Sequence, residues 1–170
     1  KISSEFHAQG KDLPMLPRIG LRMKMPDRYN HLTYYGRGPW ENYCDRKTSA
    51  FVGEYSQSTD TYEPYVRPQE NNHRTDVRWM ALTDKKGNGL LFIADDMFEM
   101  NASSYPMETF DSGDDLHNNA PVSSNTCHRH NNDPREGGFI DVCIDGRMAG
   151  VGGDNAWGAY PMPQYCITTS

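Results

Sequence analysis

The chain has 170 residues and a net charge of −6, a length that suits one domain with a hydrophobic core. Acidic and basic residues are interspersed, which argues against the basic stripe of a nucleic-acid-binding protein. No apolar run approaches the roughly 20 residues that a membrane-spanning helix needs. The mean hydropathy of −0.83, with 15 glycines, 11 prolines and 10 tyrosines, indicates short strands and many turns.

The ends of the chain and its cysteines give little information about function. Lys1–His7 lacks the apolar core of a signal peptide. The chain also lacks an initiator methionine, so we expect it to be a piece of a longer polypeptide. The four cysteines contain no Cys-x-x-Cys pair and are expected to be free thiols, with one or two disulfides left open.

The first third of the chain reads as strands separated by turns. Ile19, Leu21, Met23 and Met25 alternate with more polar residues or glycine, the period of a half-buried strand, and Pro26 stops it. The elements expected here are a strand over 19–25, a turn over 27–30, a strand over 31–35, a compact loop over 36–40 and a strand over 50–55.

The clearest hairpin covers residues 75–94. Thr75–Thr83 is predicted as a strand with Val77, Trp79 and Ala81 on one face, and with residues 76, 78 and 80 on the other. Asp84–Gly89 has the residue types of a hairpin loop. Leu90–Ala94 is predicted to run back as a short strand, and Asp95 and Asp96 are expected in a solvated turn.

The second half of the chain is less regular. Its expected elements are a short helical turn within 105–116, a polar loop over 117–138, a strand over 139–144 and the start of a last strand over 165–167. No segment sustains a helical period. The sequence therefore predicts an all-β, antiparallel β-sandwich, with residues 1–170 in a single domain.

A glycine-dense segment, Gly150–Gly158, follows the strand expected over 139–144 and contains Trp157. Glycine tolerates positive φ and lets the backbone pass close to other groups. Such a loop can hold one large side chain at the rim of a sheet. Spacing alone leaves two interpretations open: Trp157 caps the hydrophobic core, or it forms a flat platform for a ligand such as a sugar ring.

The residue types used in catalysis form no recognisable set. His117, His128 and His130 lack the paired spacing of a structural zinc site, so no metal site is predicted. The carboxylates show no spacing that marks a glycosidase pair. The serines lack the Gly-x-Ser-x-Gly pattern of a serine hydrolase, and the glycine segment opens no phosphate-binding helix.

Three ordered blocks resemble the last domain of large bacterial β-galactosidases of glycoside hydrolase family 2. The family has blocks of the form GRGPxENYPDR, RPQENGNRTDVRW and NID…GVGGDDSWG. The matching segments are 34–48, 65–79 and 143–157, and 126–130 is similar to a further histidine-containing region. The departures are Cys44 for proline, Cys143 for asparagine, and Asn155-Ala156 for Asp-Ser. The likeness covers residues 14–167.

The resemblance implies a β-sandwich of the galactose mutarotase-like (supersandwich) type that packs near a (β/α)₈ catalytic barrel. The two catalytic glutamates belong to that barrel, as do the magnesium and sodium ions near it, so this segment is expected to carry no catalytic residue and no cofactor. Trp157 matches a tryptophan that stacks on the incoming galactoside, and Asp154 and Asn155 match its neighbours. The part of the domain before Lys1 and the end of the final strand are expected to be missing.

The expected partners are therefore the other domains of the parent enzyme, the galactoside substrate and further copies in a homo-oligomer. The bacterial compartment, cytoplasmic or periplasmic, stays open. Two other functions also stay open: a freestanding aldose epimerase that uses one of the three histidines as its acid, and a non-catalytic carbohydrate-binding module. Fold alone does not choose among them.

Overall fold

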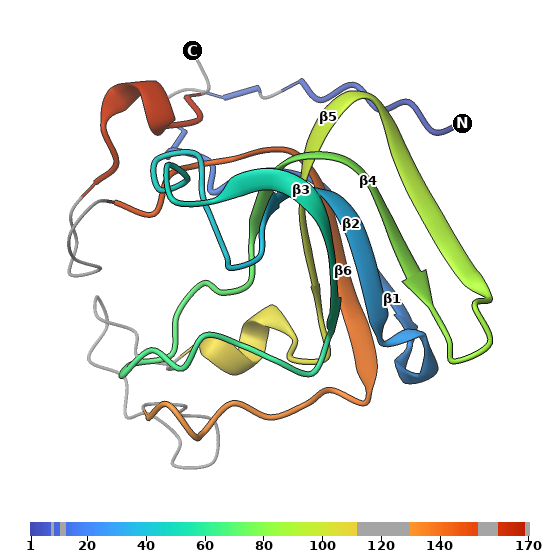
Figure 1. Ribbon diagram of the computed structural model, residues 1–170. Coiled ribbons are helices and arrows are strands. Elements are labelled where there is room, and N and C mark those ends of the chain that lie inside the picture. Colours follow the sequence, from blue (N-terminus) through green and yellow to red (C-terminus); the bar gives the residue numbers. More distant parts are fainter. Residues whose placement is uncertain (8, 11–12, 112–129, 153–159, 169–170) are drawn as a thin grey trace.

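Six antiparallel strands in one sheet make up the computed structural model (Figure 1), which describes residues 1–7, 9–10, 13–111, 130–152 and 160–168. The strand order is β1-β6-β5-β4-β2-β3. The strands are β1 Arg18–Pro26, β2 His31–Gly38, β3 Phe51–Ser58, β4 Arg74–Thr83, β5 Gly89–Ser103 and β6 Phe139–Met148. The all-β antiparallel class is confirmed, and the sheet is consistent with the predicted sandwich.

The core follows from the alternation predicted for the first strand. Met25 of β1 lies opposite Ile140 of β6, and Met23 lies opposite Val142, so these apolar side chains share one face of the sheet. The same face continues through β5, β4 and β2. Its fully buried side chains include Leu32, Tyr34, Val77, Met80, Leu82, Met100, Ile140 and Val142.

The predicted hairpin between β4 and β5 is confirmed, and its loop closes through Asp84. Oδ1 of Asp84 accepts hydrogen bonds from the backbone N–H of Lys86 at 2.8 Å and of Asn88 at 2.9 Å. Gly87 has φ +82°, which glycine adopts without steric cost. The returning strand is longer than predicted, because β5 runs on to Ser103.

The predicted faces of β4 were wrong. Val77 is buried together with Met80 and Leu82, whereas Trp79 and Ala81 point to the other face. The register shifts between Val77, which pairs with Phe98, and Trp79, which pairs with Ile93. The chain thus advances further along β5 than along β4 between these two pairs. Such a bulge moves the side chains beyond it to the opposite face, and alternation in the sequence does not reveal it.

The same irregularity accounts for the two aspartates expected in a turn. Asp95 and Asp96 lie inside β5, between the two paired stretches, and both are exposed. That expectation was wrong, because β5 bulges here and does not reverse. Figure 1 shows β5 bending at this end of the sheet.

The remaining short elements match the expectations in part. The predicted turn after β1 is a 3₁₀ turn, η1 (Asp27–Tyr29), and the predicted helical turn is η2 (Met107–Phe110). The loop expected over 36–40 begins later, since β2 extends to Gly38. The last predicted strand is reduced to η3 (Pro163–Tyr165) and an isolated bridge between Ile167 and Leu16.

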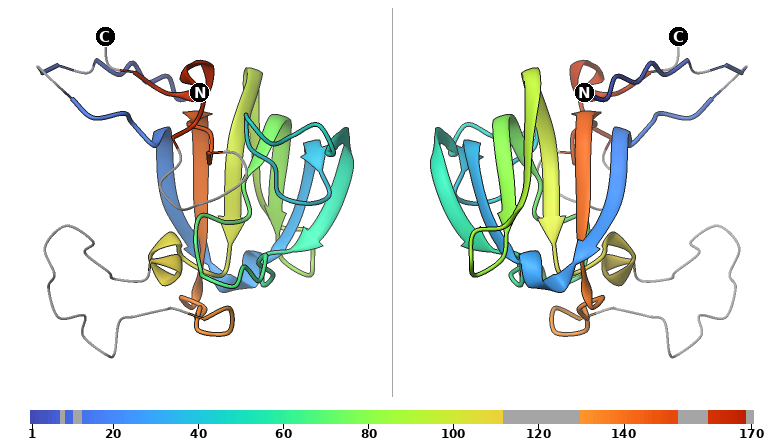
Figure 2. Two further views of the ribbon diagram at one scale, coloured as in Figure 1. Left: turned by 90° about the vertical axis from the view of Figure 1, so that its left-hand side faces the viewer. Right: turned by 90° about the vertical axis from the view of Figure 1, so that its right-hand side faces the viewer.

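The two faces of the sheet differ. The connections between β2 and β3 and between β3 and β4, together with η2, gather on one side of the sheet, and β1 and β3 form its two edges (Figures 1 and 2). The core face continues into an open cleft of about 620 Å³ whose apolar lining includes Ile19, Leu21, Phe92, Phe98 and Ile144. No helix in the described ranges has the length and apolarity to cross a membrane.

Candidate functional site

The predicted substrate-binding residues Asp154, Asn155 and Trp157 lie outside the described residues, as does the rest of 153–159. The structure describes the stem that carries this loop, Gly150–Gly152, which follows β6 and Ala149. How the stem is held therefore decides where the loop starts.

Asp45 holds the stem from a segment more than one hundred residues earlier. Its Oδ1 accepts a hydrogen bond from the backbone N–H of Val151 at 3.1 Å, and its Oδ2 accepts one from Gly152 at 3.0 Å. The N–H of Gly150 donates to the carbonyl of Tyr165 at 2.9 Å. The stem is therefore held by Asp45 on one side and by Tyr165 on the other. The bonds to Asp45 are the stronger ones, because their acceptor is a charged carboxylate.

Two glycines make this approach possible. A Cβ on Gly150 would lie 2.4 Å from Oδ2 of Asp45, closer than non-bonded atoms come. Gly152 has φ +90°, a conformation that residues with a side chain rarely adopt. Glycine is thus required at both positions for the stem to reach the carboxylate.

A tight turn presents Asp45 to the stem. Tyr43 and Arg46 exchange backbone hydrogen bonds, at 3.1 Å from Tyr43 N–H and 2.8 Å from Arg46 N–H. Buried Glu41 anchors the turn, because it accepts hydrogen bonds from Arg46 Nη2 at 2.6 Å and from the backbone N–H of Asn72 at 2.8 Å. The block 41–46 and the block around 72 are therefore one structural unit.

Tyr65 completes this unit. Its hydroxyl donates to Oε1 of Glu41 and accepts from Arg46 Nη2 at 2.8 Å. Burial, followed by the neighbouring Glu41 carboxylate, raises the pKa of Tyr65 to about 12. The phenol therefore stays protonated and serves as a donor to the carboxylate over the whole neutral range.

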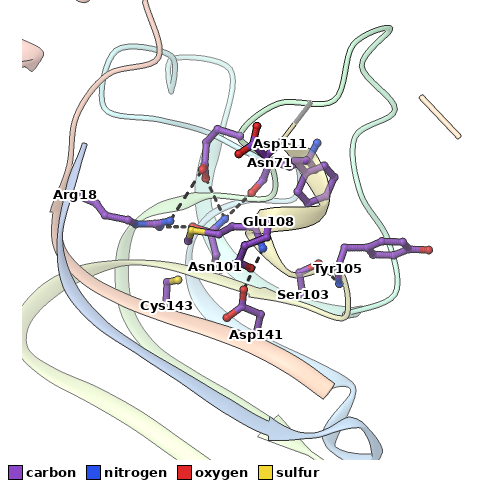
Figure 3. Close-up of a pocket in the computed structure, with 12 residues that line it drawn as sticks. Arg18, Asn71, Asn101, Ser103, Tyr105, Glu108, Asp111, Asp141 and Cys143 are labelled. Carbon is purple, nitrogen blue, oxygen red and sulfur yellow. Dashed lines mark hydrogen bonds and ion pairs between the residues drawn. The ribbon is translucent and has the colours of Figure 1, made fainter. Parts of the chain in front are cut away.

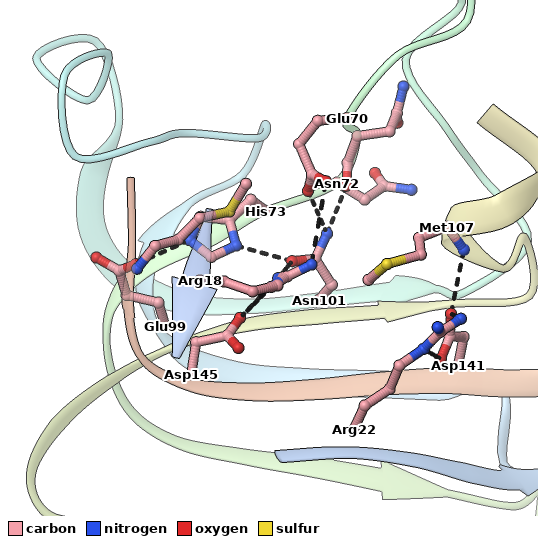
Figure 4. Close-up of polar contacts among 12 residues, drawn as sticks. Arg18, Arg22, Glu70, Asn72, His73, Glu99, Asn101, Met107, Asp141 and Asp145 are labelled. Carbon is pink, nitrogen blue, oxygen red and sulfur yellow. Dashed lines mark hydrogen bonds and ion pairs between the residues drawn. The ribbon is translucent and has the colours of Figure 1, made fainter. Parts of the chain in front are cut away.

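A second polar cluster lies beside this unit (Figure 4), and its members on β5 alternate with the buried core residues of that strand, so they point to the opposite face of the sheet. The buried ring of His73 stacks on Tyr43, with centroids 5.2 Å apart. Its Nδ1 lies 2.7 Å from Oδ1 of Asn101, and its Nε2 lies 3.1 Å from Oε2 of Glu99. The same Glu99 oxygen accepts the N–H of Met148 at 2.7 Å, which fixes the end of β6 just before the stem.

Arg18 of β1 extends this cluster toward the surface. Its Nη2 donates to Asp145 at 2.6 Å and to Oδ1 of Asn101 at 2.8 Å. Its Nη1 lies 4.0 Å from Oε2 of Glu70. Burial is the largest influence on Glu70 and raises the pKa of its carboxyl group, although the nearby guanidinium opposes this.

A second arginine ties η2 to the sheet. Arg22 Nη2 donates to Asp141 at 2.6 Å and to Oε2 of Glu108 at 2.6 Å. The backbone N–H of Met107 also donates to Asp141, at 3.1 Å. The hydrogen bond from Arg22 is the main reason that the pKa of Glu108 falls to about 2.

A pocket of about 350 Å³ lies over β1, β5 and β6, and some residues of these two clusters line it (Figure 3). Arg18 and Asn71 lie at the wall of the pocket, and Glu70 lies next to Arg18, with Oε2 4.0 Å from Nη1. Asn101 and Cys143 lie on the sheet beneath them. The remaining lining comes from β5, β6 and the segment around η2, namely Ser103, Tyr105, Met107, Glu108, Phe110, Asp111 and Asp141.

The residues considered for other chemistry do not converge. His117 and His128 lie outside the described residues, and His130 is exposed, with its backbone N–H donating to Asp133. Within the described ranges no three His, Cys, Asp or Glu side chains meet at a position that could hold a metal ion. Cys44, Cys143 and Cys166 are free thiols there.

Sequence reasoning missed the residues that organise this region. Asp45, Glu70 and Arg18 looked like ordinary charged residues, because Val151, which binds Asp45, and Asp145, which binds Arg18, lie more than one hundred positions away from them. The one available signal was that Asp45 and Glu70 fall inside the first two resembling blocks.

Comparison with known proteins gives a consistent result. Residues 1–170 match the family described as "Beta galactosidase small chain". A protein named β-galactosidase from Priestia megaterium is 34% identical over 161 residues, which cover 94% of this chain and 14% of that protein. One from Vibrio cholerae is 32% identical over 92% of this chain and 13% of its own length. One from Halalkalibacterium halodurans is 31% identical, with 98% and 15% covered. The chain thus spans about one seventh of these relatives.

Proposed function

Because the chain belongs to the β-galactosidase small chain family, we propose that it works as one part of a larger β-galactosidase. The complete enzyme hydrolyses terminal β-D-galactosides such as lactose and retains the anomeric configuration. It uses one glutamate as the nucleophile and another as the acid/base. Both glutamates belong to a catalytic barrel elsewhere in the complete enzyme, so the isolated segment is inactive.

The contribution of this segment is an aromatic wall for the sugar. Trp157 stacks on the galactose ring, and Asp154 and Asn155 flank it. The observation that carries this proposal is the fixed stem, since the Asp45 carboxylate binds the N–H groups of Val151 and Gly152. A loop that is held at its base can present one side chain at a constant position, and such positioning raises affinity by reducing the entropy lost on binding.

The apolar cleft on the core face supports the second part of the proposal, that the segment packs against the remainder of the parent enzyme. Leu21 is 43% exposed and Leu91 61% exposed beside this cleft. Contiguous exposed apolar surface marks an interaction site. The natural occupant is the rest of the enzyme, because the relatives are about seven times longer than this chain.

The resemblance places magnesium and sodium ions near the catalytic barrel. The residues described here do not fit a metal, since no three suitable side chains converge among them. No step of the proposal therefore passes through a metal held by this chain.

The experiment that tests the proposal is the substitution Trp157→Ala in the full-length enzyme. Losing one large aromatic face should cost about 1–3 kcal/mol of binding, which is roughly a 5- to 150-fold rise in KM for lactose. The value of kcat should change less, if the contact is equally strong in the ground and transition states. Trp40→Ala is the matched control, because Trp40 is 55% exposed. An unchanged KM for Trp157→Ala would refute the role given to the loop.

A further inference from the structure

The pocket over β1, β5 and β6 carries the features of a ligand site. We propose that it binds a neutral polyol of monosaccharide size, such as a hexose. Its volume of about 350 Å³ lies within the range of small-molecule sites, which runs from about 300 to 1,000 Å³. The proposal rests on the pocket's own chemistry and does not depend on the Trp157 loop.

The charges around the pocket favour a neutral ligand. Asp141 and Glu108 are already engaged by the Arg22 guanidinium, so they are not available to pair with a cation. Glu70 adds a further carboxylate to the lining, 4.0 Å from Arg18, and it opposes the entry of an anion such as a sugar phosphate. Neither a metal ion nor a phosphate therefore matches the site.

Among the described residues, Arg18 and Glu70 lie at the pocket and keep hydrogen-bonding capacity beyond their contacts with one another's neighbours. Arg18 donates from Nε and Nη2 to Asp145 and Asn101, and its Nη1 lies 4.0 Å from Oε2 of Glu70, beyond hydrogen-bonding distance. Oε1 of Glu70 accepts a hydrogen bond of 3.4 Å from Asn101, and the Glu70 side chain is 29% exposed to solvent. A donor and an acceptor thus lie next to each other at the wall.

Neighbouring hydroxyls of a sugar match this arrangement. A hydroxyl group can donate one hydrogen bond and accept others, so one hydroxyl can accept from Arg18 while the next donates to Glu70. Both protein groups are held by their other partners, which keeps the pair preorganised. Tyr105 and Phe110 add aromatic surface at the η2 side of the pocket, the combination of apolar walls and a few polar groups that small-molecule sites use.

The test is a crystal structure of the full-length protein soaked in D-galactose, with a parallel soak in D-galactose 6-phosphate. We expect hexose density within hydrogen-bonding distance of Arg18 Nη1 and the Glu70 carboxylate, and no density for the phosphate in the pocket. An empty pocket in the galactose soak would overturn the proposal. Density for the phosphate alone would also overturn it, because the ligand class would then be wrong.

A pair of variants tests the role of Glu70. Glu70→Gln keeps the size of the side chain and removes the charge, and it should weaken hexose binding in the pocket about tenfold, the loss expected for a hydrogen bond to a charged group. Glu54→Gln on the exposed face of β3 is the control and should leave binding unchanged. Equal occupancy in both variants would contradict the role of Glu70. If Glu70→Gln fails to fold, the wild-type soaks still decide. A pocket that stays empty while sugar binds at Trp157 would refute this inference alone and leave the proposed function intact.

Discussion

Asp45→Asn should loosen the glycine loop without touching the sugar. The wild-type carboxylate accepts two backbone N–H groups, at 3.1 and 3.0 Å. Asparagine keeps one acceptor oxygen, places an NH₂ group against the other N–H and loses the negative charge. A hydrogen bond to a charged group contributes about 1.5–3 kcal/mol, so we take a loss of about 2 kcal/mol for the closed stem. That loss lowers the ratio of closed to open stem roughly thirtyfold.

The consequence for the enzyme depends on how strongly the wild-type stem favours the closed state. If the wild-type stem favours the closed state by a ratio between about 1:1 and about 10:1, KM for a β-galactoside rises about four- to fifteenfold, and kcat changes less. Steady-state kinetics on the full-length enzyme measure this directly. Asp96→Asn is the control, because Asp96 is exposed in β5, and it should leave KM unchanged.

A double-mutant cycle makes the reasoning refutable. If Asp45 acts only by positioning Trp157, then Asp45→Asn should raise KM by less than about twofold when Trp157 is already alanine. The same increase in both backgrounds would show that Asp45 acts independently of the loop. An unchanged KM in the wild-type background would refute the role of the stem altogether.

Three further predictions concern the scaffold. Gly150→Ala places a Cβ 2.4 Å from Oδ2 of Asp45, so thermal unfolding should show a loss of about 1–3 kcal/mol, with KM raised as for Asp45→Asn. Glu41→Ala removes a buried carboxylate with several donors and should lower the free energy of unfolding by about 3–5 kcal/mol in denaturant titrations. Glu108→Gln should cost at most about 1 kcal/mol at neutral pH, because the ion pair with Arg22 is solvent-exposed.

The pH dependence expected for Glu108→Gln follows from the lowered pKa of Glu108. The pKa of Glu108 falls from 4.5 to about 2 in the folded protein, so its stabilising effect is present above about pH 4.5 and is lost as the pH falls toward 2. The stability difference between wild type and Glu108→Gln should therefore shrink on acidification. A difference that stays constant from neutral pH down to about 2 would contradict the ion pair with Arg22.

Local patterns predicted the strands well and their faces less well. The alternation from Ile19 to Met25 identified β1, and the turn residues after Thr83 identified the β4–β5 hairpin. The faces of β4 could not be predicted, because a bulge is set by how β4 pairs with β5 and leaves no mark on the alternation. The length of β5 was missed for the same reason.

The polar site was beyond local reasoning. The contacts of Asp45 with Val151 and of Arg18 with Asp145 join positions 106 and 127 residues apart. Charged residues are normally read as surface residues, and only the folded sheet brings Asp45 and Arg18 to their partly buried partners. The resemblance to β-galactosidases supplied what spacing could not, namely that segments 34–48, 65–79 and 143–157 match three ordered blocks of one domain.

The central claim is that the loop beginning at Gly150 forms one wall of a sugar site. A crystal structure of the full-length enzyme with a bound β-galactoside tests it most directly. We predict that the ring of Trp157 lies flat against the sugar within about 4 Å, the distance of apolar contact, with the Asp45 carboxylate still bound to Val151 and Gly152. A galactoside bound in the catalytic barrel with Trp157 turned away, out of contact with it, would contradict the claim.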